Sequence, residues 1–387
     1  MLSFNNTEIA FSGKTNNDLN RSYWLFKMVS NPMFVNIGQV LTNFSIKIHL
    51  PIKGLIKATI FKQFCGGETI EECDKTIKEL GRFKVGTILD YSVEGKETEQ
   101  DFDACFTETI ATIVKAKNDS LIPFCVFKVT GLARFSLLEK VTADQVLTSD
   151  EKKEFERVEN RVNSICKAAH EAGTPVFIDA EESWIQKAVD DLANKMMAMY
   201  NIQKPIVYNT FQMYCKDKLA FLKHSLDIAQ KNNYYLGVKL VRGAYMEKER
   251  ARAAEKNYPS PIQDKKENTD SDYDAALLFC VENIDRIAIC AGTHNENSSM
   301  NLVQLMKDKN IPGSNKHIFF SQLLGMSDHI SFNLADAGYH VAKYVPYGPV
   351  NEVLPYLIRR AKENTSVKGQ TGRELSLIIN EKQRRKA

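Results

Sequence analysis

Two consecutive arginines, Arg359 and Arg360, have the side chains best suited to bind a small anion. They belong to a segment in which apolar residues recur with helical spacing over 353–358, after a predicted short strand at 341–346. Neighbouring helical residues point about 100° apart, so both guanidinium groups reach one anion only when it lies beside the helix between them. A guanidinium group binds a carboxylate or a phosphate through two parallel hydrogen bonds. Glu363, four residues after Arg359, is spaced to pair with it and orient it.

A plainer interpretation of the same helix is a solvated C-terminal end. Lys and Arg side chains in such a position complement the helix dipole without binding a ligand. The helix taken alone leaves both interpretations open. The choice between them depends on the elements that surround it.

Short apolar segments alternate with longer amphipathic ones from residue 84 onward. There are eight of them, at 84–91, 121–129, 175–180, 205–210, 235–241, 286–291, 317–322 and 341–345. Helical patterns follow them, for example at 151–172 and 184–200. Alternating strands and helices predict a parallel sheet, and eight units favour a closed (β/α)8 barrel over an open sheet. No GxGxxG motif follows the first strand, which also disfavours the open sheet.

The N-terminal region has a different pattern, with helical segments and no strands between them. Apolar segments at 23–28 and 35–41 are separated by Asn31 and Pro32, and a third helix is predicted at 69–80. We therefore expect an α/β protein in three parts. These are an N-terminal helical arm at 1–83, a (β/α)8 barrel at 84–370 and a basic C-terminal tail at 371–387.

Polar side chains follow nearly every predicted strand, at the end where the active site of a (β/α)8 barrel lies. They are Asp90, Glu94, Lys128, Asp179, Glu181, Glu182, Gln212, Lys239, Arg242, Tyr245, Thr293, His294, Asn295, Gln322 and Tyr344. A single one of them, such as His294, could have a purely structural role. Lys128 is harder to explain in that way, because a lysine is almost never buried without a partner. Together with Arg359 and Arg360 it predicts a cationic site for a small carboxylate, but neither a cofactor nor a reaction.

The composition excludes several classes of protein. Lys and Arg number 51 and Asp and Glu 48, so the net charge of +3 disfavours a nucleic-acid-binding protein. Eight cysteines without CxxC spacing predict buried thiols in a reducing compartment. No apolar run approaches the roughly 18 residues of a membrane span. Glu8 and Asp18 fit poorly with a transit peptide, and we expect a soluble, intracellular protein.

Several long segments at these strand ends resemble the proline dehydrogenase family. They are FKVTGL (127–132), FIDAEES (177–183), KLVRGAYMEKERARA (239–253), THN (293–295), QLLGMSD (322–328) and KYVPYGPVNEVLPYLIRRAKEN (343–364). The similarity extends over 84–367 and is closer to the monofunctional, mitochondrial-type enzymes than to the long bifunctional bacterial proteins. It implies a distorted (β/α)8 barrel that binds FAD non-covalently. It also implies oxidation of L-proline to Δ1-pyrroline-5-carboxylate, by hydride transfer from proline C5 to flavin N5, with a quinone as electron acceptor.

The resemblance implies a role for each candidate residue around the substrate. Arg359, Arg360 and Lys128 would bind the proline carboxylate. The residues that pack on the pyrrolidine ring would be Leu240, Tyr344 and Tyr356. Glu94 would pair with Arg359 above the bound substrate. A second layer that orients these cations would consist of Asp179, Tyr245 and Glu363.

The resemblance also implies which residues contact the flavin and its pyrophosphate. They would be Gln212, Lys239, Arg242, Thr293, His294, Asn295 and Gln322. The bifunctional proteins have Arg where this sequence has Lys239, and the two side chains differ in hydrogen-bonding geometry. The flavin contact of Lys239 is therefore the least secure part of the comparison. No metal is implied.

Two other functions remain to be separated from proline oxidation. A hydroxyproline dehydrogenase of the same fold is disfavoured by Tyr344, whose ring leaves little room for a ring hydroxyl. A non-catalytic barrel that binds a small carboxylate is disfavoured because every polar position carries a competent residue.

The length leaves no room for an aldehyde dehydrogenase domain or a DNA-binding module, so we expect a separate pyrroline-5-carboxylate dehydrogenase. We expect a cytoplasmic location, with peripheral contact to an inner membrane left open, on the matrix face of the mitochondrion in a eukaryote.

Overall fold

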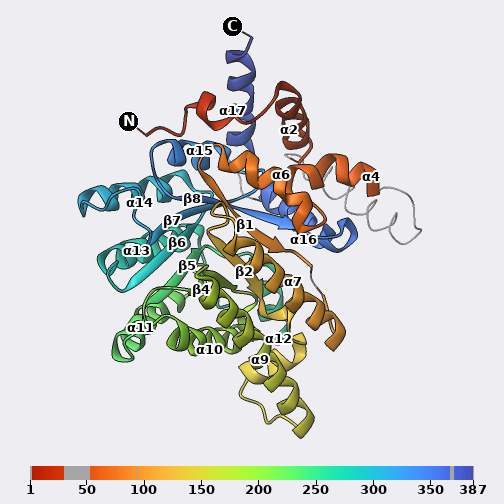
Figure 1. The fold of residues 1–387 in the computed structure, drawn as a ribbon, viewed down its shortest axis with the longest axis vertical. Coiled ribbons are helices and arrows are strands. Elements are labelled where there is room, and N and C mark those ends of the chain that lie inside the picture. Colours follow the sequence, from red (N-terminus) through yellow and green to blue (C-terminus); the bar gives the residue numbers. More distant parts are fainter. Residues whose placement is uncertain (1, 30–52, 94, 367–369, 387) are drawn as a thin grey trace. The chain divides into compact units, whose positions relative to one another are not determined.

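Eight parallel strands form a closed barrel in the order of the chain (Figure 1). The computed structural model describes residues 2–29, 53–93, 95–366 and 370–386, with the backbone alone at 29, 53, 55, 361–366, 370 and 371. The strands are β1 (Val85–Tyr91), β2 (Phe124–Lys128), β3 (Val176–Asp179), β4 (Val207–Gln212), β5 (Leu236–Val241), β6 (Ile287–Gly292), β7 (Ile318–Leu323) and β8 (Val341–Tyr347). Each strand overlaps one of the eight predicted segments, so the predicted α/β barrel is confirmed.

Helices connect the strands and also form the N-terminal part of the chain. The α-helices are α1 (Thr7–Ala10), α2 (Asn16–Val29), α4 (Lys53–Ile56), α5 (Lys62–Phe64), α6 (Ile70–Gly81), α7 (Glu99–Lys117), α8 (Phe135–Thr142), α9 (Ser149–Ala172), α10 (Ser183–Tyr200), α11 (Lys218–Lys231), α12 (Met246–Lys256), α13 (Lys266–Glu282), α14 (Glu296–Asp308), α15 (Asp328–Asp336), α16 (Val350–Ser366) and α17 (Gln370–Arg384). A π-helix, η1 (Lys57–Phe61), and a 3-10 helix, η2 (Val129–Gly131), complete the set among the described residues. The predicted helix at 69–80 corresponds to α6, whereas the predicted segment at 35–41 lies outside the described residues.

Local sequence signals determine where several helices begin and end. The side chains of Thr69, Thr98 and Thr148 each accept a hydrogen bond from the backbone N–H three residues later. At α9 the Glu151 side chain returns a bond to the Thr148 backbone, which completes a capping box. The same helix ends at Gly173, whose φ of 70° is a left-handed conformation that glycine adopts without strain. Each of these signals lies within a few residues of the helix end that it sets.

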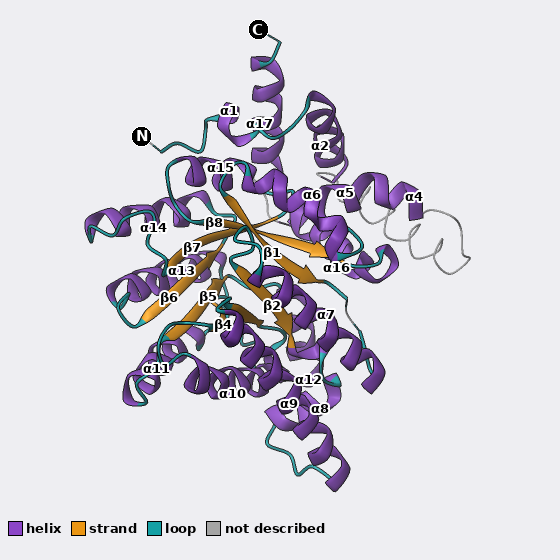
Figure 2. Ribbon diagram, viewed as in Figure 1, coloured by secondary structure: helices purple, strands orange, loops and turns teal. Residues whose placement is uncertain are grey.

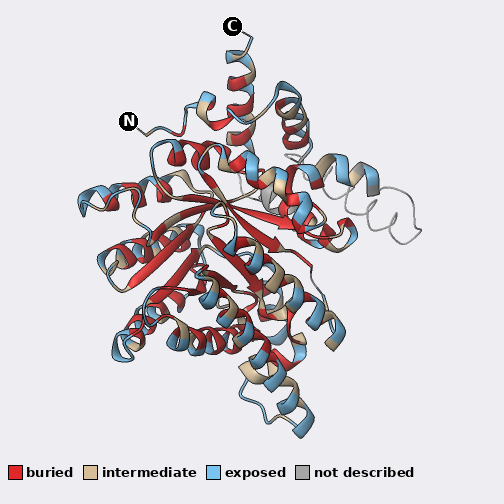
Figure 3. Ribbon diagram, in the orientation of Figure 1, coloured by how far each residue is buried: buried red, intermediate tan, exposed pale blue. Residues whose placement is uncertain are grey.

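The structure divides into two compact units, Met1–Glu94 with Gln322–Ala387, and Gly95–Ser321. In the second unit, β2–β6 pair as parallel neighbours in chain order. Helices α10, α11 and α13 lie outside these strands (Figure 2). All six residues of β4 are buried, and the strands of the unit appear almost entirely as buried residues in Figure 3. Strands buried on both faces explain the continuous apolar segments in the sequence.

In the first unit, β1 and β8 pair in parallel over their whole length, from Val85↔Val341 to Tyr91↔Tyr347. Helix α1 packs on α15, and α17 packs on α2. The residues expected to form a basic tail thus lie largely in α17, which buries Glu374, Leu377, Ile378 and Glu381, side chains spaced to lie on one side of a helix. The division into arm, barrel and tail stays a prediction.

Two expectations from composition can be compared with the structure. All eight cysteines are free and buried, as predicted. Burial raises the pKa of several of their thiols, for example that of Cys125 to about 12, so these thiols stay protonated and inert. Within the described parts of the chain, no helix is both long enough and apolar enough to span a lipid bilayer.

Candidate active site

The second unit places one carboxylate, Asp179, between two lysines. Lys239 Nζ lies 2.5 Å from Asp179 Oδ1, and Lys128 Nζ lies 3.9 Å from Asp179 Oδ2. Asp179 ends β3 and Lys239 belongs to β5, so their side chains meet across β4, on the interior side of the strands. Lys239 and Asp179 are both buried, and the Lys239 ammonium also lies 5.5 Å from the centre of the Phe177 ring. The structure therefore brings three of the predicted residues into one charged cluster.

A second buried carboxylate, Glu181, lies just beyond this cluster. The Thr130 hydroxyl donates a hydrogen bond of 2.5 Å to Glu181 Oε2, and the Thr130 backbone N–H donates to Oε1 at 3.2 Å. Burial raises the pKa of Glu181 to about 7, against the lowering effect of Thr130 and Lys128. The predicted flavin contact Gln212 is also buried here, and its side-chain amide donates to the Glu181 carbonyl oxygen at 2.7 Å. A carboxyl group that changes charge near neutral pH thus lies beside the Lys128–Asp179 pair.

Arg242 connects the ends of β5 and β6. Its Nη1 donates to Thr293 Oγ1 at 2.7 Å, its Nη2 to Ser298 Oγ at 2.9 Å and its Nε to Asp270 Oδ1 at 2.6 Å. The guanidinium carbon lies 4.4 Å from the centre of the Tyr273 ring. A guanidinium group has five N–H donors, so these three bonds leave two N–H groups for a ligand. The structure therefore brings the predicted residues Arg242 and Thr293 together.

The turn that follows Thr293 begins α14. Asn295 is the N-cap of this helix, and its side-chain oxygen accepts a hydrogen bond from Ser298 N at 3.2 Å. His294 lies between Thr293 and Asn295 and is half-buried. A helix N-terminus beside a guanidinium group and a hydroxyl group is a set of donors that suits an anion.

Two predicted residues on β5 and α12 have different surroundings. Leu240 is fully buried opposite Phe211. Because successive strand residues face opposite sides, Leu240 faces away from the side of β5 that carries Lys239. Tyr245 precedes α12 and is buried, and Lys248 Nζ lies 5.6 Å from the centre of its ring. The roles expected for Leu240 and Tyr245 therefore stay predictions.

The first unit carries the paired arginines on α16, which is held firmly in place. Its residues Val353, Leu354 and Leu357 are buried in an apolar cluster with Phe61 and Phe64. At its start, Val350 N donates a hydrogen bond to Glu68 Oε2 at 3.2 Å. Glu68 Oε1 in turn accepts from Lys57 Nζ at 2.6 Å. These contacts anchor the first half of α16, which carries the side chains of Arg359 and Arg360.

The two arginines of α16 differ in burial. Arg360 lies on the buried side of the helix, with only 8% of its surface exposed, and its guanidinium carbon is 5.0 Å from the centre of the Tyr356 ring. Arg359 is half-buried. A solvated helix end therefore does not describe Arg360, because a stacked and buried guanidinium group is withdrawn from bulk water. The side chain of Glu363 lies outside the described residues, so its pairing with Arg359 stays a prediction.

Strand β8 separates a buried charge from a buried aromatic ring. Lys343 is fully buried, and its Nζ lies 2.8 Å from Asp328 Oδ1 at the start of α15. Tyr344 is the next residue, so its ring faces the opposite side of the strand. Tyr344 is 6% exposed. Gln322, which is also buried, accepts a hydrogen bond from Ser331 Oγ at 2.7 Å.

The predicted residues after β1 are only partly described. Asp90 is buried, and its Oδ2 accepts a hydrogen bond from Ser92 Oγ at 2.8 Å. Glu94 lies outside the described residues, so the predicted pair with Arg359 stays a prediction.

The model of the family described as "Proline dehydrogenase" matches residues 73–373, which is most of the chain. The chain belongs to the proline dehydrogenase family. As a proline dehydrogenase it is an oxidoreductase of proline catabolism, and the predicted family is confirmed.

Curated proline dehydrogenases are similar to this chain over much of its length. "Proline dehydrogenase 1, mitochondrial" of Dictyostelium discoideum is 34% identical over 98% of this chain and 74% of its own length. The human protein of the same name is 39% identical over 60% of this chain and 39% of its own length. A third relative, "Carbapenem antibiotics biosynthesis protein CarD" of Pectobacterium carotovorum, is 33% identical over 86% of each chain.

Solved structures similar to this chain include bacterial proline utilization A (PutA). PutA from Bdellovibrio bacteriovorus matches with a TM-score of 0.74 at 21% identity, over 93% of this chain and 38% of its own. A PutA structure "with proline bound in remote sites" matches with a TM-score of 0.68 at 22% identity, over 80% of this chain and 31% of its own. At such identities the similarity shows the fold alone, and it agrees with the proline dehydrogenase barrel.

Several residues that build these clusters were not among the predicted site residues. Asp270 and Ser298 position Arg242, and Thr130 holds Glu181. Glu249 is fully buried, and its carboxylate accepts two hydrogen bonds from Ser183, at 2.6 Å from N and 2.7 Å from Oγ. These contacts join residues 28 to 66 positions apart, so no local pattern in the sequence indicates them.

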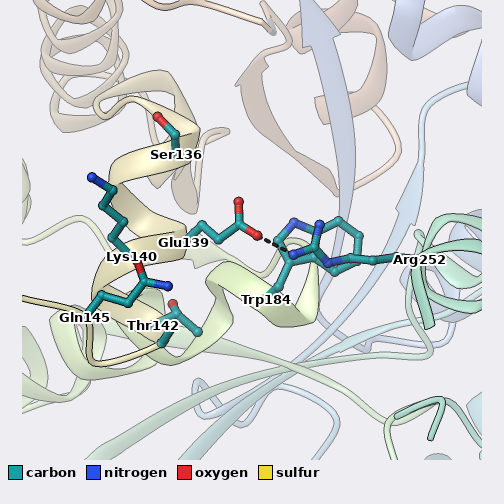
Figure 4. A pocket seen from close by; sticks show the side chains of 8 residues that line it. Ser136, Glu139, Lys140, Thr142, Gln145, Trp184 and Arg252 are labelled. Atoms are coloured by element: carbon teal, nitrogen blue, oxygen red, sulfur yellow. Dashed lines mark hydrogen bonds and ion pairs between the residues drawn. The ribbon is translucent and has the colours of Figure 1, made fainter. Parts of the chain in front are cut away.

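A depression of about 580 Å³ lies apart from these clusters, among α8, α10 and α12 of the second unit (Figure 4). Its lining includes Glu139, Trp184 and Arg252 but none of the predicted site residues. Glu139 forms an ion pair with Arg252, whose guanidinium carbon lies 4.5 Å from the centre of the Trp184 ring. The second cation of its lining, Lys140, pairs with Glu151 at 2.5 Å. Both cations are thus paired within the protein, and the depression is not the candidate active site of the proline dehydrogenase barrel.

Proposed function

We propose that this chain is an FAD-dependent enzyme that oxidises L-proline to Δ1-pyrroline-5-carboxylate and passes the electrons to a quinone. The family supports proline as the substrate. The geometric observation that supports carboxylate binding most strongly is Arg360, a buried cation that lies 5.0 Å from the centre of the Tyr356 ring. A cation withdrawn from water binds a carboxylate more strongly than an exposed one.

The residues at the ends of β5 and β6 fit an anionic dinucleotide. Arg242 keeps two N–H groups beside the Thr293 hydroxyl and the N-terminus of α14. These donors, together with His294, Asn295 and Lys239, would hold the pyrophosphate of FAD. When bound, the flavin would supply the two-electron acceptor chemistry, by hydride transfer from proline C5 to flavin N5.

The remaining predicted residues would position the substrate. Arg359, Arg360 and Lys128 would bind the carboxylate, and Tyr344 and Tyr356 would pack on the pyrrolidine ring. Asp179 would keep Lys128 and Lys239 oriented, since it already lies within 3.9 Å of both ammonium groups. Holding the ring in one orientation and excluding water are the protein's contributions to the rate.

The acceptor, the partner enzyme and the location complete the proposal. A separate pyrroline-5-carboxylate dehydrogenase would consume the product. A quinone acceptor requires contact with an inner membrane, which is mitochondrial in a eukaryote. The curated relatives named as mitochondrial support that location.

The direct test is anaerobic addition of L-proline to the purified protein. We expect the visible flavin absorbance to disappear with proline and to return when an acceptor is added. A colourless protein would contradict FAD binding. A yellow protein that proline does not bleach would instead support the non-catalytic carboxylate-binding barrel, and faster bleaching by 4-hydroxyproline would support the hydroxyproline dehydrogenase.

Tyr344 provides a test of substrate specificity. Its buried ring would leave little room for the hydroxyl of 4-hydroxyproline, so Tyr344→Ser should lower kcat/KM for proline and raise the ratio of hydroxyproline to proline. A pocket change of this size shifts such a ratio by about 10- to 200-fold. Steady-state kinetics with both substrates measure it. Tyr344→Phe keeps the ring and should leave the ratio nearly unchanged, and an unchanged ratio in Tyr344→Ser would show that Tyr344 does not line the pocket.

A further inference from the structure

In the first unit, helices α2 and α17 carry exposed apolar side chains on neighbouring surfaces. Trp24 and Met28, four residues apart on α2, are 59% and 49% exposed, and Ile379 on α17 is 36% exposed. A large exposed aromatic residue next to further apolar residues is uncommon on a protein surface unless it binds something. Of the ten exposed large hydrophobic residues in the described parts of the chain, these three lie on one pair of packed helices.

Cations are interleaved with these apolar residues. Lys27 Nζ lies 5.2 Å from the centre of the Trp24 ring and 5.7 Å from that of Tyr23. From α17, Lys382 Nζ lies 4.4 Å from the centre of the Tyr23 ring, so Tyr23 joins the two helices. We call the surface formed by Tyr23, Trp24, Lys27, Met28, Ile379 and Lys382 the α2–α17 face.

The acidic residues of α17 are withdrawn from the α2–α17 face. Glu374 and Glu381 are 4% and 0% exposed. Glu381 is bound by Arg384 at 2.9 Å and by Arg385 at 2.7 Å, so its charge is already neutralised. The charged groups that α17 leaves accessible are therefore basic: Arg373 and Lys382 are half-buried and Arg384 is exposed, and Lys386, two residues after the helix, is exposed as well.

The amino-acid sequence extends the same charge pattern along the chain. From residue 19 to residue 67 there is no Asp or Glu, although the whole chain has 48 of them. The same stretch contains Arg21, Lys27, Lys47, Lys53, Lys57 and Lys62. A nearly neutral protein thus has one region from which carboxylates are excluded.

We propose that the α2–α17 face docks on the surface of an anionic lipid bilayer. Trp and Tyr prefer the boundary between headgroups and acyl chains. Lysine stems lie along apolar surface while their ammonium groups reach the anionic headgroups. The proposed function uses a quinone that is dissolved in a membrane. This inference rests on that function where it concerns the quinone, and it names the surface of the protein that contacts the membrane. Docking itself can be measured without any acceptor.

A second copy of the chain is a poorer occupant of this face. A two-fold dimer would place the face against itself, so that Lys382 of one copy would approach the cations of the other. Like charges across an interface disfavour association. A bilayer with anionic headgroups supplies the missing negative charge and also accepts Trp24 and Met28.

Tryptophan fluorescence can report the docking directly, because Trp24 and Trp184 are the only two tryptophans. In the full-length Trp184→Phe variant, all tryptophan emission comes from Trp24. We expect a blue shift with vesicles of phosphatidylcholine containing phosphatidylglycerol, and little or none with phosphatidylcholine alone. Raising the salt concentration should reverse the shift in part, since it screens the attraction between lysines and headgroups. An emission spectrum that is the same with and without anionic vesicles would contradict the proposal.

Cosedimentation with the same vesicles tests which residues carry the binding. The double variant Trp24→Ser, Met28→Ser should bind at least about tenfold more weakly, because two apolar side chains are lost. Lys27→Gln with Lys382→Gln should weaken binding to anionic vesicles by about tenfold or more. Matched controls are Val146→Ser and Met199→Ser in the second unit, where the side chains are 94% and 50% exposed. The controls should bind like the wild type, and proline oxidation with a soluble acceptor should stay unchanged in all variants.

Three further results would overturn this docking surface. They are vesicle binding that survives both double variants, binding that the control substitutions weaken equally, and a dimer in sedimentation velocity that Trp24→Ser, Met28→Ser converts to monomers. The last result would make the α2–α17 face a subunit interface. If proline fails to bleach the flavin while the vesicle results hold, the proposed function fails and the docking surface stands.

Discussion

Replacing Arg360 with methionine should raise the KM for proline strongly while leaving the flavin content unchanged. Arg360 is buried and stacked on Tyr356, so it is already held for a carboxylate before the substrate arrives. Removing one partner of a buried charge pair costs about 2–5 kcal/mol. That corresponds to an increase in KM between about 30-fold and a few thousand-fold. Steady-state kinetics with a soluble electron acceptor measure it.

Two further substitutions make the result specific to Arg360. Arg360→Lys keeps the positive charge but loses the planar guanidinium group that binds a carboxylate through two parallel hydrogen bonds, so we expect an intermediate KM. Arg373→Met removes an arginine of the same unit that donates to Asn5 Oδ1 instead, and it should leave KM unchanged. A KM that changes less than about threefold in Arg360→Met would remove Arg360 from the carboxylate site.

The second large effect is expected on stability. Asp179→Ala should lower the free energy of unfolding by about 3–5 kcal/mol. The substitution removes the carboxylate that lies 2.5 Å from Lys239 Nζ and leaves that buried ammonium group without this ion pair. Urea denaturation followed by circular dichroism gives the difference. The flavin contact proposed for Lys239 should weaken as well, which the flavin content of the purified variant would show.

A double-variant cycle separates loss of the ion pair from loss of packing. Asp179→Ala with Lys239→Met removes both charges and should recover part of the stability that Asp179→Ala loses. Asp191→Ala is the matched surface control, since Asp191 pairs with Lys187 at 3.2 Å but both side chains are more than half exposed. It should cost less than about 1 kcal/mol. A loss of similar size in Asp179→Ala and in Asp191→Ala would show that the buried pair does not hold the cluster together.

The barrel and the family could be predicted from the sequence because their signals are local. Each strand is a short apolar segment between polar ones, and burial on both faces leaves no other pattern for a parallel strand. The Asp179 side chain ends such a segment and meets Lys239 from another, as the common edge of a barrel suggests. The residues expected to form a basic tail lie largely in α17, where the buried side chains of Glu374, Leu377, Ile378 and Glu381 recur at helical spacing.

What each predicted residue contacts was decided by the tertiary structure. The sequence treats Arg359 and Arg360 alike, and only the packing of α16 on the cluster with Phe61 and Phe64 buries the second more than the first. The partners of Arg242 come from α13 and α14, 28 and 56 residues further along the chain.

By itself, then, the sequence determined the strands, the barrel, the family and the type of side chain at each strand end, because these depend on residue type and short-range spacing. The tertiary structure decided which charges are buried and which remain exposed. It placed Lys239 against Asp179, and it buried Glu374 and Glu381 so that α17 exposes mainly cations. The physical reason is that burial depends on all the neighbours of a residue. The interaction energy of a charge then depends on how much water those neighbours exclude and on whether they include an opposite charge.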